Sequence, residues 1–415
     1  MNVVVIGAGA AGMIAAITSS KEGNNVTVLE KTGDAGNKLK ITGKGRCNLT
    51  FEGDFEYFSK NIAVNNKFMY SAYNNFSNKD TINFFNNLGV KTKLERGNRI
   101  FLESDNANEV VSALKKELKK NNVNLVYNSN IKKILTEENK VIGVLLDNNT
   151  KVPCDKCIIA TGGKSYPKTG STGDGYILAQ ALGHTVVDIK PALVPLKSND
   201  SICKELQGLT LKNVEIKVLD SGKCVYTDFG EMLFAHFGLT GPIILSSSSK
   251  INRIKDLGSK LKEKSIYISI DLKPALSIDV LDKRLQRDFE KYTNKEFKNS
   301  LEDLLPQKLI PYIIKESSID EDKKVHQITK EERLNLCNLL KNLKVNIAGL
   351  MAVETGIVTS GGISTKEINP KTMESKIIKG LYFAGEVIDI DAYTGGFNLQ
   401  IAFSTGYVAG QNLDC

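Results

Sequence analysis

The first 30 residues constrain the fold more strongly than any other part of the chain. The apolar run 3–6 leads directly into Gly7-Ala-Gly9-Ala-Ala-Gly12, and residues 13–21 then have helical composition. A strand, a glycine-rich turn and a helix in this order are typical of a dinucleotide-binding unit. Gly7 permits the tight turn, Gly9 lets the backbone approach a pyrophosphate, and Gly12 permits close packing of helix and strand. We therefore expect a parallel Rossmann sheet with a phosphate site at the start of this helix.

An acidic residue follows the second expected strand. Residues 26–29 are apolar except for Thr27, as in a strand, and Glu30 comes directly after them. Its offset from Gly7 is close to the ~20 residues expected for the acidic ribose ligand of such folds. A carboxylate at this point accepts hydrogen bonds from ribose hydroxyls and repels a 2′-phosphate. Further cofactor-binding candidates in these two segments are Ala10, Ala11 and Lys31.

The C-terminal part of the chain favours FAD over NAD. Residues 381–385 have the pattern of a last buried strand that ends in a sharp turn, and residues 395–410 that of a turn and a helix. A C-terminal return to the nucleotide domain suits FAD, because its flavin lies far from its pyrophosphate. Asp389 would accept a ribityl hydroxyl, and N–H groups at the helix start would face the flavin edge that becomes negative on reduction. The alternative is a generic final strand and helix. Predicted ligands here are Gly385, Glu386, Asp389, Gly395, Gly396, Phe397 and Asn398.

Two internal segments supply the remaining cofactor candidates. The loop 36–50 is rich in glycine and lysine, so it would close over the pyrophosphate and pass the flavin, with Arg46 and Asn48 as donors. Cys47 would contact the flavin or be a packed, unreactive thiol. Residues 160–163 follow a strand at the sheet edge where ligands bind. The candidates are Lys38, Gly45, Arg46, Cys47, Asn48, Thr161, Gly162 and Gly163. The glycine-rich segment 170–175 would hold the cofactor or shape the substrate cleft.

The candidates for proton transfer are few. Of the three histidines, His184 and His326 are expected at the surface, and His236 lies between two phenylalanines ahead of a glycine-rich turn. A histidine in this setting is either structural or a catalytic acid. Tyr393 is a second catalytic candidate. No Ser-His-Asp order, phosphate-binding lysine loop or metal-ligand cluster is present in the sequence, so we expect neither a hydrolase nor a kinase, and no metal.

The character of the chain changes near residues 191 and 349. Helices are expected over most of residues 56–122, an antiparallel meander over 131–146, and a helix capping box at Thr329-x-x-Glu332. Strands among turns begin near 191, three helical stretches follow, and glycine-rich strands return near 350. The predicted domains are therefore 1–190 and 349–415, which form one FAD-binding domain, and an inserted region at 191–348.

Composition limits the environment and the partners. The 415 residues include 55 basic and 47 acidic side chains, which give a net charge of +8. The lysines are scattered beside acidic residues, so they do not favour a nucleic-acid partner. No apolar run approaches the ~20 residues that a membrane helix needs. The start of the chain has no signal-peptide pattern, and the seven cysteines are odd in number and widely spaced. We expect a cytoplasmic protein with reduced thiols.

Several motifs together resemble the BaiN/YhiN-like flavoproteins, some of which are labelled aminoacetone oxidase family FAD-binding enzymes. They are Gly43-Lys-Gly45-Arg46-Cys47-Asn48, residues 160–163, 170–175 and 234–242, and the tail 381–410. The resemblance covers nearly the whole chain in the same order. It implies an α/β fold: a glutathione-reductase-type Rossmann FAD domain with an inserted β-barrel and helical subdomain. Phe397 and Ile401 stand where Tyr and Trp are common in this family.

These observations predict an FAD-dependent oxidoreductase. The resemblance implies hydride transfer among NAD(P)H, flavin and a small organic acceptor such as a conjugated C=C. A second GxGxxG is absent, so NADH or NADPH would bind without a complete Rossmann fingerprint of its own. Either His236 or Tyr393 would supply the proton. Two alternatives stay open: an FAD oxidase that uses oxygen and an amine or aminoketone, and a flavin-bearing RNA-associated factor. The sequence does not indicate the oligomeric state.

Overall fold

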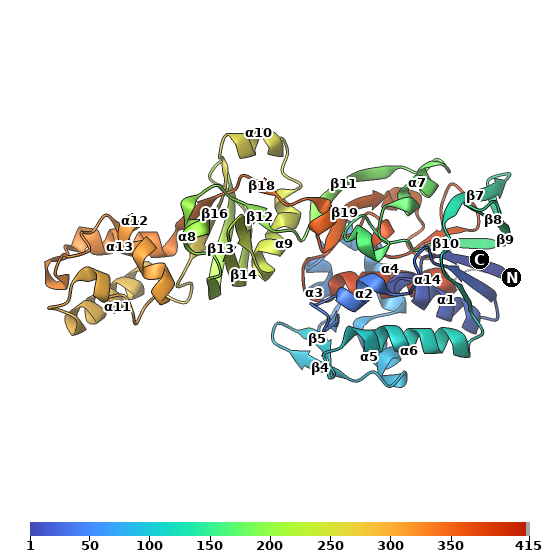
Figure 1. Cartoon of the computed structure of the whole chain (residues 1–415), viewed down its shortest axis with the longest axis horizontal. Helices are drawn as coiled ribbons and strands as arrows, with labels where there is room; N and C mark the ends of the chain where they lie inside the picture. Colours follow the sequence, from blue (N-terminus) through green and yellow to red (C-terminus); the bar gives the residue numbers. More distant parts are fainter. Residues whose placement is uncertain (412–415) are drawn as a thin grey trace. The chain divides into compact units, whose positions relative to one another are not determined.

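The computed structural model describes residues 1–411, which form two compact units. Unit 1 consists of Met1–Ala192 and of the segment from Ala352 onward, and unit 2 is Leu193–Met351 (Figure 1). The boundaries expected from the sequence are 190/191 and 348/349. Each unit has its own hydrophobic core.

A five-stranded parallel sheet forms the centre of unit 1. Its order is β20 (Leu381–Phe383), β10 (Lys156–Ile159), β1 (Asn2–Ile6), β2 (Asn25–Leu29) and β6 (Asn124–Val126), and all four pairings are parallel. Residues 3–6 of β1 are buried, as expected for a strand covered on both faces. The predicted Rossmann-type α/β fold is confirmed. One edge strand, β20, comes from the C-terminal part of the chain, so both ends of the sequence build this sheet.

Helices α1 (Ala10–Lys21) and α14 (Phe397–Gln411) pack against each other beside the sheet (Figure 1). Two glycines of α14 permit the close approach. A Cβ on Gly406 would lie 2.4 Å from the Ala11 carbonyl oxygen, and a Cβ on Gly410 would lie 2.4 Å from the Ala15 carbonyl oxygen. The backbone of α14 is thereby held against the helix that begins at the glycine-rich turn.

The segment expected to be helical contains an unexpected β-hairpin. Helices α3 (Phe55–Lys60), α4 (Met69–Asn75), α5 (Asn78–Asn87) and α6 (Ala107–Lys120) confirm most of the prediction. For residues 92–102 the prediction is wrong, because β4 (Thr92–Glu95) and β5 (Arg99–Leu102) form an antiparallel pair that β3 (Asn48–Phe51) extends. Both strands are short, and the pairing with β3 is a long-range contact that local composition does not reveal.

Smaller elements complete unit 1. The predicted meander is confirmed by β7 (Ile131–Glu137), β8 (Lys140–Leu146) and β9 (Lys151–Pro153). A separate antiparallel pair joins β11 (Val186–Ala192) to β19 (Val358–Ile363). The helix α2 (Asn37–Ile41) lies within the segment 36–50, which the sequence predicts as a loop, and α7 (Asp174–Gln180) begins within the glycine-rich segment 170–175.

Unit 2 is built on a seven-stranded antiparallel sheet. Its order is β17 (Leu343–Asn346), β16 (Ile266–Asp271), β13 (Thr210–Asp220), β14 (Lys223–Ala235), β15 (Gly238–Thr240), β12 (Leu196–Lys197) and β18 (Gly349–Leu350). Its helices are α8 (Ser201–Glu205), α9 (Pro242–Ile251), α10 (Leu257–Lys262), α11 (Ile278–Lys291), α12 (Ile310–Ser317) and α13 (Lys330–Lys341). The predicted capping box of Thr329 and Glu332 is present at the start of α13. Across residues 1–411, no helix combines the length and the apolar character needed to cross a membrane.

His184 is buried, which contradicts the surface position expected from the sequence. Its Nε2 lies 2.9 Å from Ser375 Oγ, its Nδ1 lies 3.3 Å from Glu367 Oε2, and its ring packs edge-on against Phe383. These partners come from a segment about 180–200 residues further along the chain, so the sequence around His184 gives no sign of them. Burial lowers the pKa of His184, although nearby Glu367 acts in the opposite direction.

This burial predicts an acid-sensitive contribution to stability. A histidine with a lowered folded-state pKa contributes its full stabilisation above its unfolded pKa, about 6.5, and loses it as the pH falls below that value. We expect the melting temperature of a His184→Gln variant to vary less with pH than that of the wild type between about pH 6.5 and 5. Thermal melts over this range test the expectation. Parallel curves for the two proteins would contradict it.

Candidate active site

A cavity of about 500 Å³ opens in unit 1 at the carboxyl ends of the parallel strands. Its walls include residues 7–11 after β1, Glu30 and Lys31 after β2, residues 160–162 after β10, and residues 384–386 after β20. Ligands of open α/β sheets bind at this edge. The cavity therefore lies where the sequence predicts the cofactor.

The turn between β1 and α1 is built for close approach of a ligand. Gly7 has a φ of 101°, and a Cβ on Gly12 would lie 1.9 Å from the Gly7 carbonyl oxygen. A Cβ on Gly9, in contrast, would have no atom within 4 Å, and Gly9 caps α1 without a side-chain hydrogen bond. The first N–H groups of α1 thus lack a side-chain cap beside an open cavity wall. This arrangement fits a pyrophosphate.

Glu30 is held rigidly at the end of β2. Its Oε2 accepts a 2.8 Å hydrogen bond from the Ala8 N–H, and its Oε1 accepts from the Thr32 N–H at 2.8 Å and from the Thr32 hydroxyl at 2.7 Å. Next to it, Lys31 Nζ forms a 2.6 Å ion pair with Asp174 of α7. Residues 169–171 and Asp174 line the same cavity, so the glycine-rich segment 170–175 borders the cofactor site.

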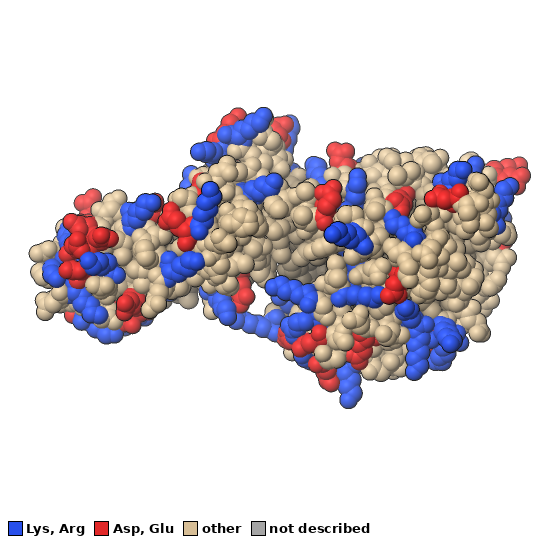
Figure 2. All heavy atoms as spheres, viewed as in Figure 1, with Lys and Arg blue, Asp and Glu red and all other residues tan. Residues whose placement is uncertain are grey.

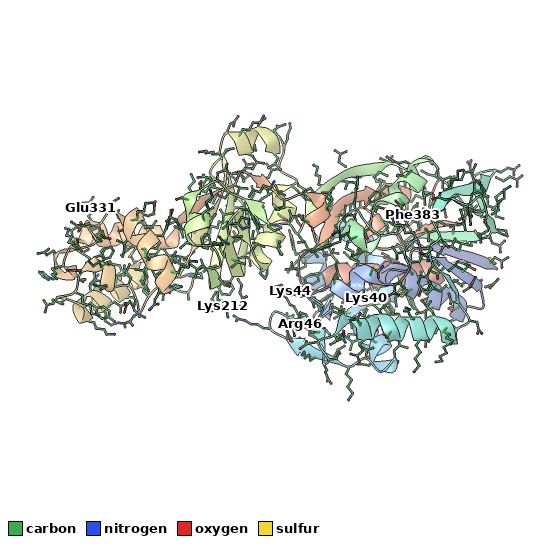
Figure 3. All side chains as sticks on the ribbon, in the orientation of Figure 1. Lys40, Lys44, Arg46, Lys212, Glu331 and Phe383 are labelled. Atoms are coloured by element: carbon green, nitrogen blue, oxygen red, sulfur yellow. The ribbon has the colours of Figure 1, made fainter. Side chains whose placement is uncertain are left out.

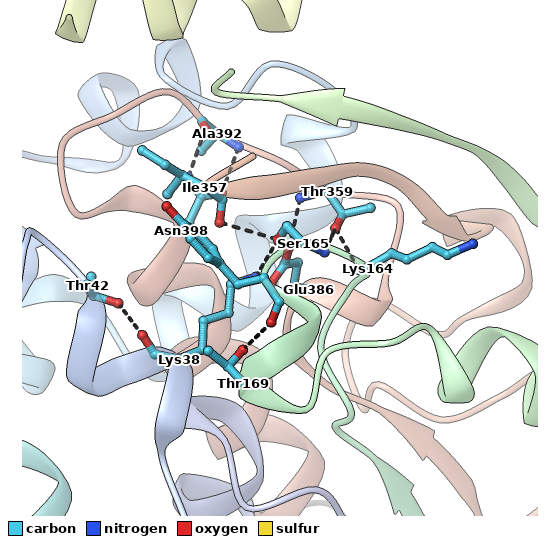
Figure 4. Close-up of polar contacts among 11 residues, drawn as sticks. Lys38, Thr42, Lys164, Ser165, Thr169, Ile357, Thr359, Glu386, Ala392 and Asn398 are labelled. Carbon is cyan, nitrogen blue, oxygen red and sulfur yellow. Dashed lines mark hydrogen bonds and ion pairs between the residues drawn. The ribbon is translucent and has the colours of Figure 1, made fainter. Parts of the chain in front are cut away.

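An ion pair connects the N-terminal and C-terminal parts of this site (Figure 4). Lys38 Nζ lies 2.6 Å from Glu386 Oε2 and donates to Ser165 Oγ at 2.6 Å. Glu386 Oε1 accepts from the Thr359 N–H at 2.8 Å and from the Ser165 hydroxyl at 3.2 Å. Lys38 and Glu386 both line the cavity, and both side chains are largely buried. The network fixes a charged pair at the wall of the cavity.

The turn before α14 is fixed from both sides. Asn398 accepts from the Ala392 N–H at 2.9 Å and donates to the Ala392 carbonyl oxygen at 2.8 Å, and it lines the cavity. A Cβ on Gly396 would lie 2.3 Å from the Thr50 carbonyl oxygen, so glycine permits the contact between this turn and β3. Asp389 is buried and accepts a 3.0 Å hydrogen bond from Asn65.

The donor set fits FAD. Thr161 lines the cavity, and its buried hydroxyl has no partner among the described residues, which a polar ligand would provide. The uncapped start of α1 suits the pyrophosphate, and Glu30 suits the ribose hydroxyls. Asn398, in the first turn of α14, lines another part of the same cavity.

The structure brings about half of the predicted cofactor residues to the cavity wall. These are Gly7, Gly9, Ala10, Ala11, Glu30, Lys31, Lys38, Thr161, Gly162, Gly385, Glu386 and Asn398. Ten others lie outside that wall: Gly12, Gly45, Arg46, Cys47, Asn48, Gly163, Asp389, Gly395, Gly396 and Phe397. Some of these shape the wall indirectly; a Cβ on Gly163, for example, would lie 2.7 Å from Glu386 Oε1.

Three of the residues outside the cavity wall contact other parts of the protein instead. The guanidinium of Arg46 stacks on Phe101 at 4.4 Å and pairs with Asp105 at 2.7 Å. Burial raises the pKa of the Cys47 thiol to about 12, so it is held protonated. Phe397 packs against Phe51, with ring centroids 4.9 Å apart.

The two predicted proton donors lie in different units. Tyr393 is half-buried in unit 1, where its N–H donates to the Asn61 carbonyl oxygen at 2.9 Å. His236 is exposed in the turn between β14 and β15 of unit 2, edge-on to Phe237. Their catalytic roles stay predictions.

Sequence reasoning missed several residues of the cavity. Ser129, Lys132 and Asp147 come from the meander region, and Ile177 and Ile357 add exposed apolar surface. Ser165 holds Lys38 without being part of any recognisable motif. No local signal marks these positions, because tertiary contacts bring them to the site.

Comparisons with known proteins show the family. Residues 1–412 match the family model described as HI0933-like protein Rossmann domain. A 3-dehydro-bile acid delta(4,6)-reductase of Clostridium scindens is 29% identical over 98% of this chain and 97% of its own length. Ribosomal RNA dihydrouridine synthases of Escherichia coli and Haemophilus influenzae are each 30% identical, over 99% of this chain and 98% of their own length.

Solved structures show the same fold. A flavocytochrome c3 fumarate reductase in its open conformation matches with a TM-score of 0.52 and 16% identity, over 99% of this chain and 78% of its own. A 3-ketosteroid-delta4-(5alpha)-dehydrogenase of Rhodococcus jostii RHA1 matches with a TM-score of 0.52 and 15% identity, over 99% and 96%. The protein is therefore an FAD-dependent oxidoreductase that belongs to the HI0933-like Rossmann family.

Proposed function

We propose that this oxidoreductase reduces a carbon–carbon double bond conjugated to a carbonyl, and that its acceptor is a uracil ring in RNA. The observation that carries the proposal is the full-length similarity to relatives whose names both describe the saturation of a C=C. In uridine this bond is conjugated to the C4 carbonyl, and in a 3-dehydro-bile acid with delta(4,6) unsaturation it is conjugated to the C3 carbonyl. The two named reactions thus share one chemistry.

The residues of unit 1 would bind and orient the cofactor. FAD, when bound, supplies the two-electron chemistry of the reaction. The N–H groups at the start of α1 would hold the pyrophosphate, and Glu30 would accept from the ribose. The Lys38–Glu386 pair would keep its charges fixed at the cavity wall, so that little reorganisation is needed when charge develops.

The proposal of RNA as the acceptor departs from the sequence-based expectation that a nucleic-acid partner is not favoured. That expectation depended on the scattered lysines, and it is not confirmed, because two full-length relatives are named ribosomal RNA dihydrouridine synthases. We also propose NADH or NADPH as the reductant and the cytoplasm as the location. A flavin that reduces a C=C needs a two-electron donor, and this donor would bind without a complete Rossmann fingerprint of its own, since the sequence has no second GxGxxG. The free thiols of the described cysteines favour a reducing compartment.

The acceptor is tested by product mass. Purified protein with FAD and NADPH would be incubated with ribosomal RNA that lacks the modification, and the nucleosides would then be separated and weighed. We expect uridine at one site to gain two hydrogens. A conjugated 3-oxo steroid is the matched small acceptor, suggested by the Clostridium scindens relative. Reduction of the steroid with no change in RNA would contradict the RNA proposal, and reduction of neither would contradict the reaction class.

The proton donor is tested by two variants. We expect Tyr393→Phe to slow acceptor reduction about 100-fold, since a positioned proton donor contributes roughly 10²–10⁴-fold, and to leave reduction of FAD by NADPH unchanged. His236→Gln is the comparison, because it removes the other candidate. Stopped-flow rates against pH would show which variant loses the ionisation of the donor. Full rates in both variants would exclude both residues.

A further inference from the structure

The β3–β5–β4 sheet of unit 1 has one charged face. Lys93 pairs with Phe101, and Glu95 pairs with Arg99, in the antiparallel register of β4 and β5. Residues opposite each other, and residues two apart, share a face of a sheet. Lys91 directly precedes β4, and its carbonyl oxygen accepts a 3.0 Å hydrogen bond from the Glu103 N–H, so the pairing continues to Lys91 and places it on this face as well. On the other face, Ile100 and Leu102 are buried in the protein.

Arg46 fixes the preceding loop onto this face. Its guanidinium stacks on Phe101, and it pairs with Asp105 and with Glu95 (Figure 3 shows Arg46 and Lys44 beside the hairpin). The charge of Arg46 is therefore offset by two carboxylates. Lys44 lies two residues earlier and is exposed, with a φ of 59°, a region that costs a non-glycine residue roughly 1 kcal/mol. The loop thus presents Lys44 at the edge of the charged face.

The face has an excess of cations. Residues 43–46 and 91–105 contain the cations Lys44, Arg46, Lys91, Lys93, Arg96 and Arg99, and the carboxylates Glu95, Glu103 and Asp105. Figure 2 shows both signs of charge gathered over the hairpin. Lys93 forms an ion pair with Asp105 at 2.9 Å, and Arg46 forms ion pairs with Glu95 and Asp105. Within the described part of the chain, the side chains of Lys44, Lys91 and Arg99 have no polar partner, so their charges are available to an anion.

The loop 42–47 links the cavity wall to the charged face, and a Cβ on Gly43 of this loop would lie 3.5 Å from the Phe101 ring. Thr42, at the end of α2, lines the cavity, and Lys44 follows it by two residues. β3 begins four residues after Lys44 and contacts the turn before α14 at Gly396. A chain of anions lying on this face would therefore reach the cavity along the loop 42–47.

We propose that the face formed by Lys44, Lys91 and Arg99 binds the phosphate backbone of an RNA strand and thereby brings its uracil to the flavin that the cavity would hold. The identity of the base depends on the proposed function, whereas the phosphate contacts depend only on this surface. Phosphate contacts supply affinity and set the position of a strand without reading its sequence. A single-stranded or looped segment would suit the site, since the target base must leave its stack.

The test measures RNA binding directly. We compare the wild type with Lys91→Ala/Arg99→Ala and with the control Lys151→Ala/Lys371→Ala, which removes two exposed cations outside this face. Fluorescence anisotropy with a labelled RNA stem-loop gives the Kd at several salt concentrations. FAD content and melting temperature check the fold of each protein.

We expect the hairpin variant to bind RNA at least 10-fold more weakly than the control. The slope of log Kd against log salt should fall by about 1.4, because each contact to a single strand contributes about 0.7. Equal affinities for the hairpin variant and the control, or no RNA binding by the wild type, would overturn the proposal. RNA that binds through this face but is not reduced would overturn the proposed function alone.

Discussion

Replacing Gly9 by valine is expected to leave the protein folded and to remove FAD. A Cβ at Gly9 meets no atom within 4 Å, and the φ of this residue is −83°, so the backbone tolerates a side chain. The new methyl groups would instead occupy the space over the start of α1 that a pyrophosphate needs. We expect FAD affinity to fall at least 100-fold, which corresponds to about 2.7 kcal/mol. Flavin absorbance per protein and an FAD titration measure this loss.

Gly12→Ala is the matched counterpart, since it adds one methyl group three residues later. Its Cβ would lie 1.9 Å from the Gly7 carbonyl oxygen, so β1 and α1 would have to separate. We expect this variant to lose stability and solubility rather than FAD affinity alone. A Gly9→Val protein that folds and keeps its full flavin content would show that the turn does not hold the pyrophosphate.

Replacing Glu386 by leucine is expected to cost both stability and cofactor affinity. The carboxylate accepts from Lys38, Ser165 and the Thr359 N–H, and its removal leaves a largely buried ammonium group without its counter-charge. Breaking a buried ion pair costs about 3–5 kcal/mol, and partial exposure of this pair places our expectation near 2–3 kcal/mol. Urea unfolding and an FAD titration measure the two effects.

A double variant separates the ion pair from simple loss of packing. Lys38→Met/Glu386→Leu removes both charges, so we expect it to be more stable than Glu386→Leu alone. Glu386→Gln keeps the shape and an acceptor for the Thr359 N–H, and it should be intermediate. If the losses of stability in Lys38→Met alone and in Glu386→Leu alone simply add up to the loss in the double variant, the pair makes no coupled contribution.

The parts of the site that the sequence predicts well are those made by neighbouring residues. The turn at Gly7 and Gly9, the helix behind it and Glu30 all lie within 30 residues, and their spacing alone implies their geometry. The capping box at Thr329 and Glu332 is local in the same way. The return of the C-terminal segment was predictable because its glycine-rich turn has a recognisable form.

The remainder depends on contacts between distant residues. Lys38 and Glu386 are 348 residues apart, and nothing in either neighbourhood marks the other as its partner. The guanidinium of Arg46 is the kind of group that donates hydrogen bonds to a phosphate, yet Phe101 and two carboxylates hold it on the hairpin. His184 is polar and lies near the end of a helix, but Ser375 and Glu367 accommodate it in the core.

The most direct test of the central claim follows the flavin through one anaerobic cycle. The purified protein with FAD is reduced by one equivalent of NADPH or dithionite, and RNA is then added without oxygen. We expect the oxidised flavin spectrum to return only when unmodified RNA is present, with one dihydrouridine formed per flavin reoxidised. A flavin that stays reduced with RNA and with the conjugated steroid, and reoxidises only on admission of oxygen with release of hydrogen peroxide, would contradict this account and indicate an oxidase.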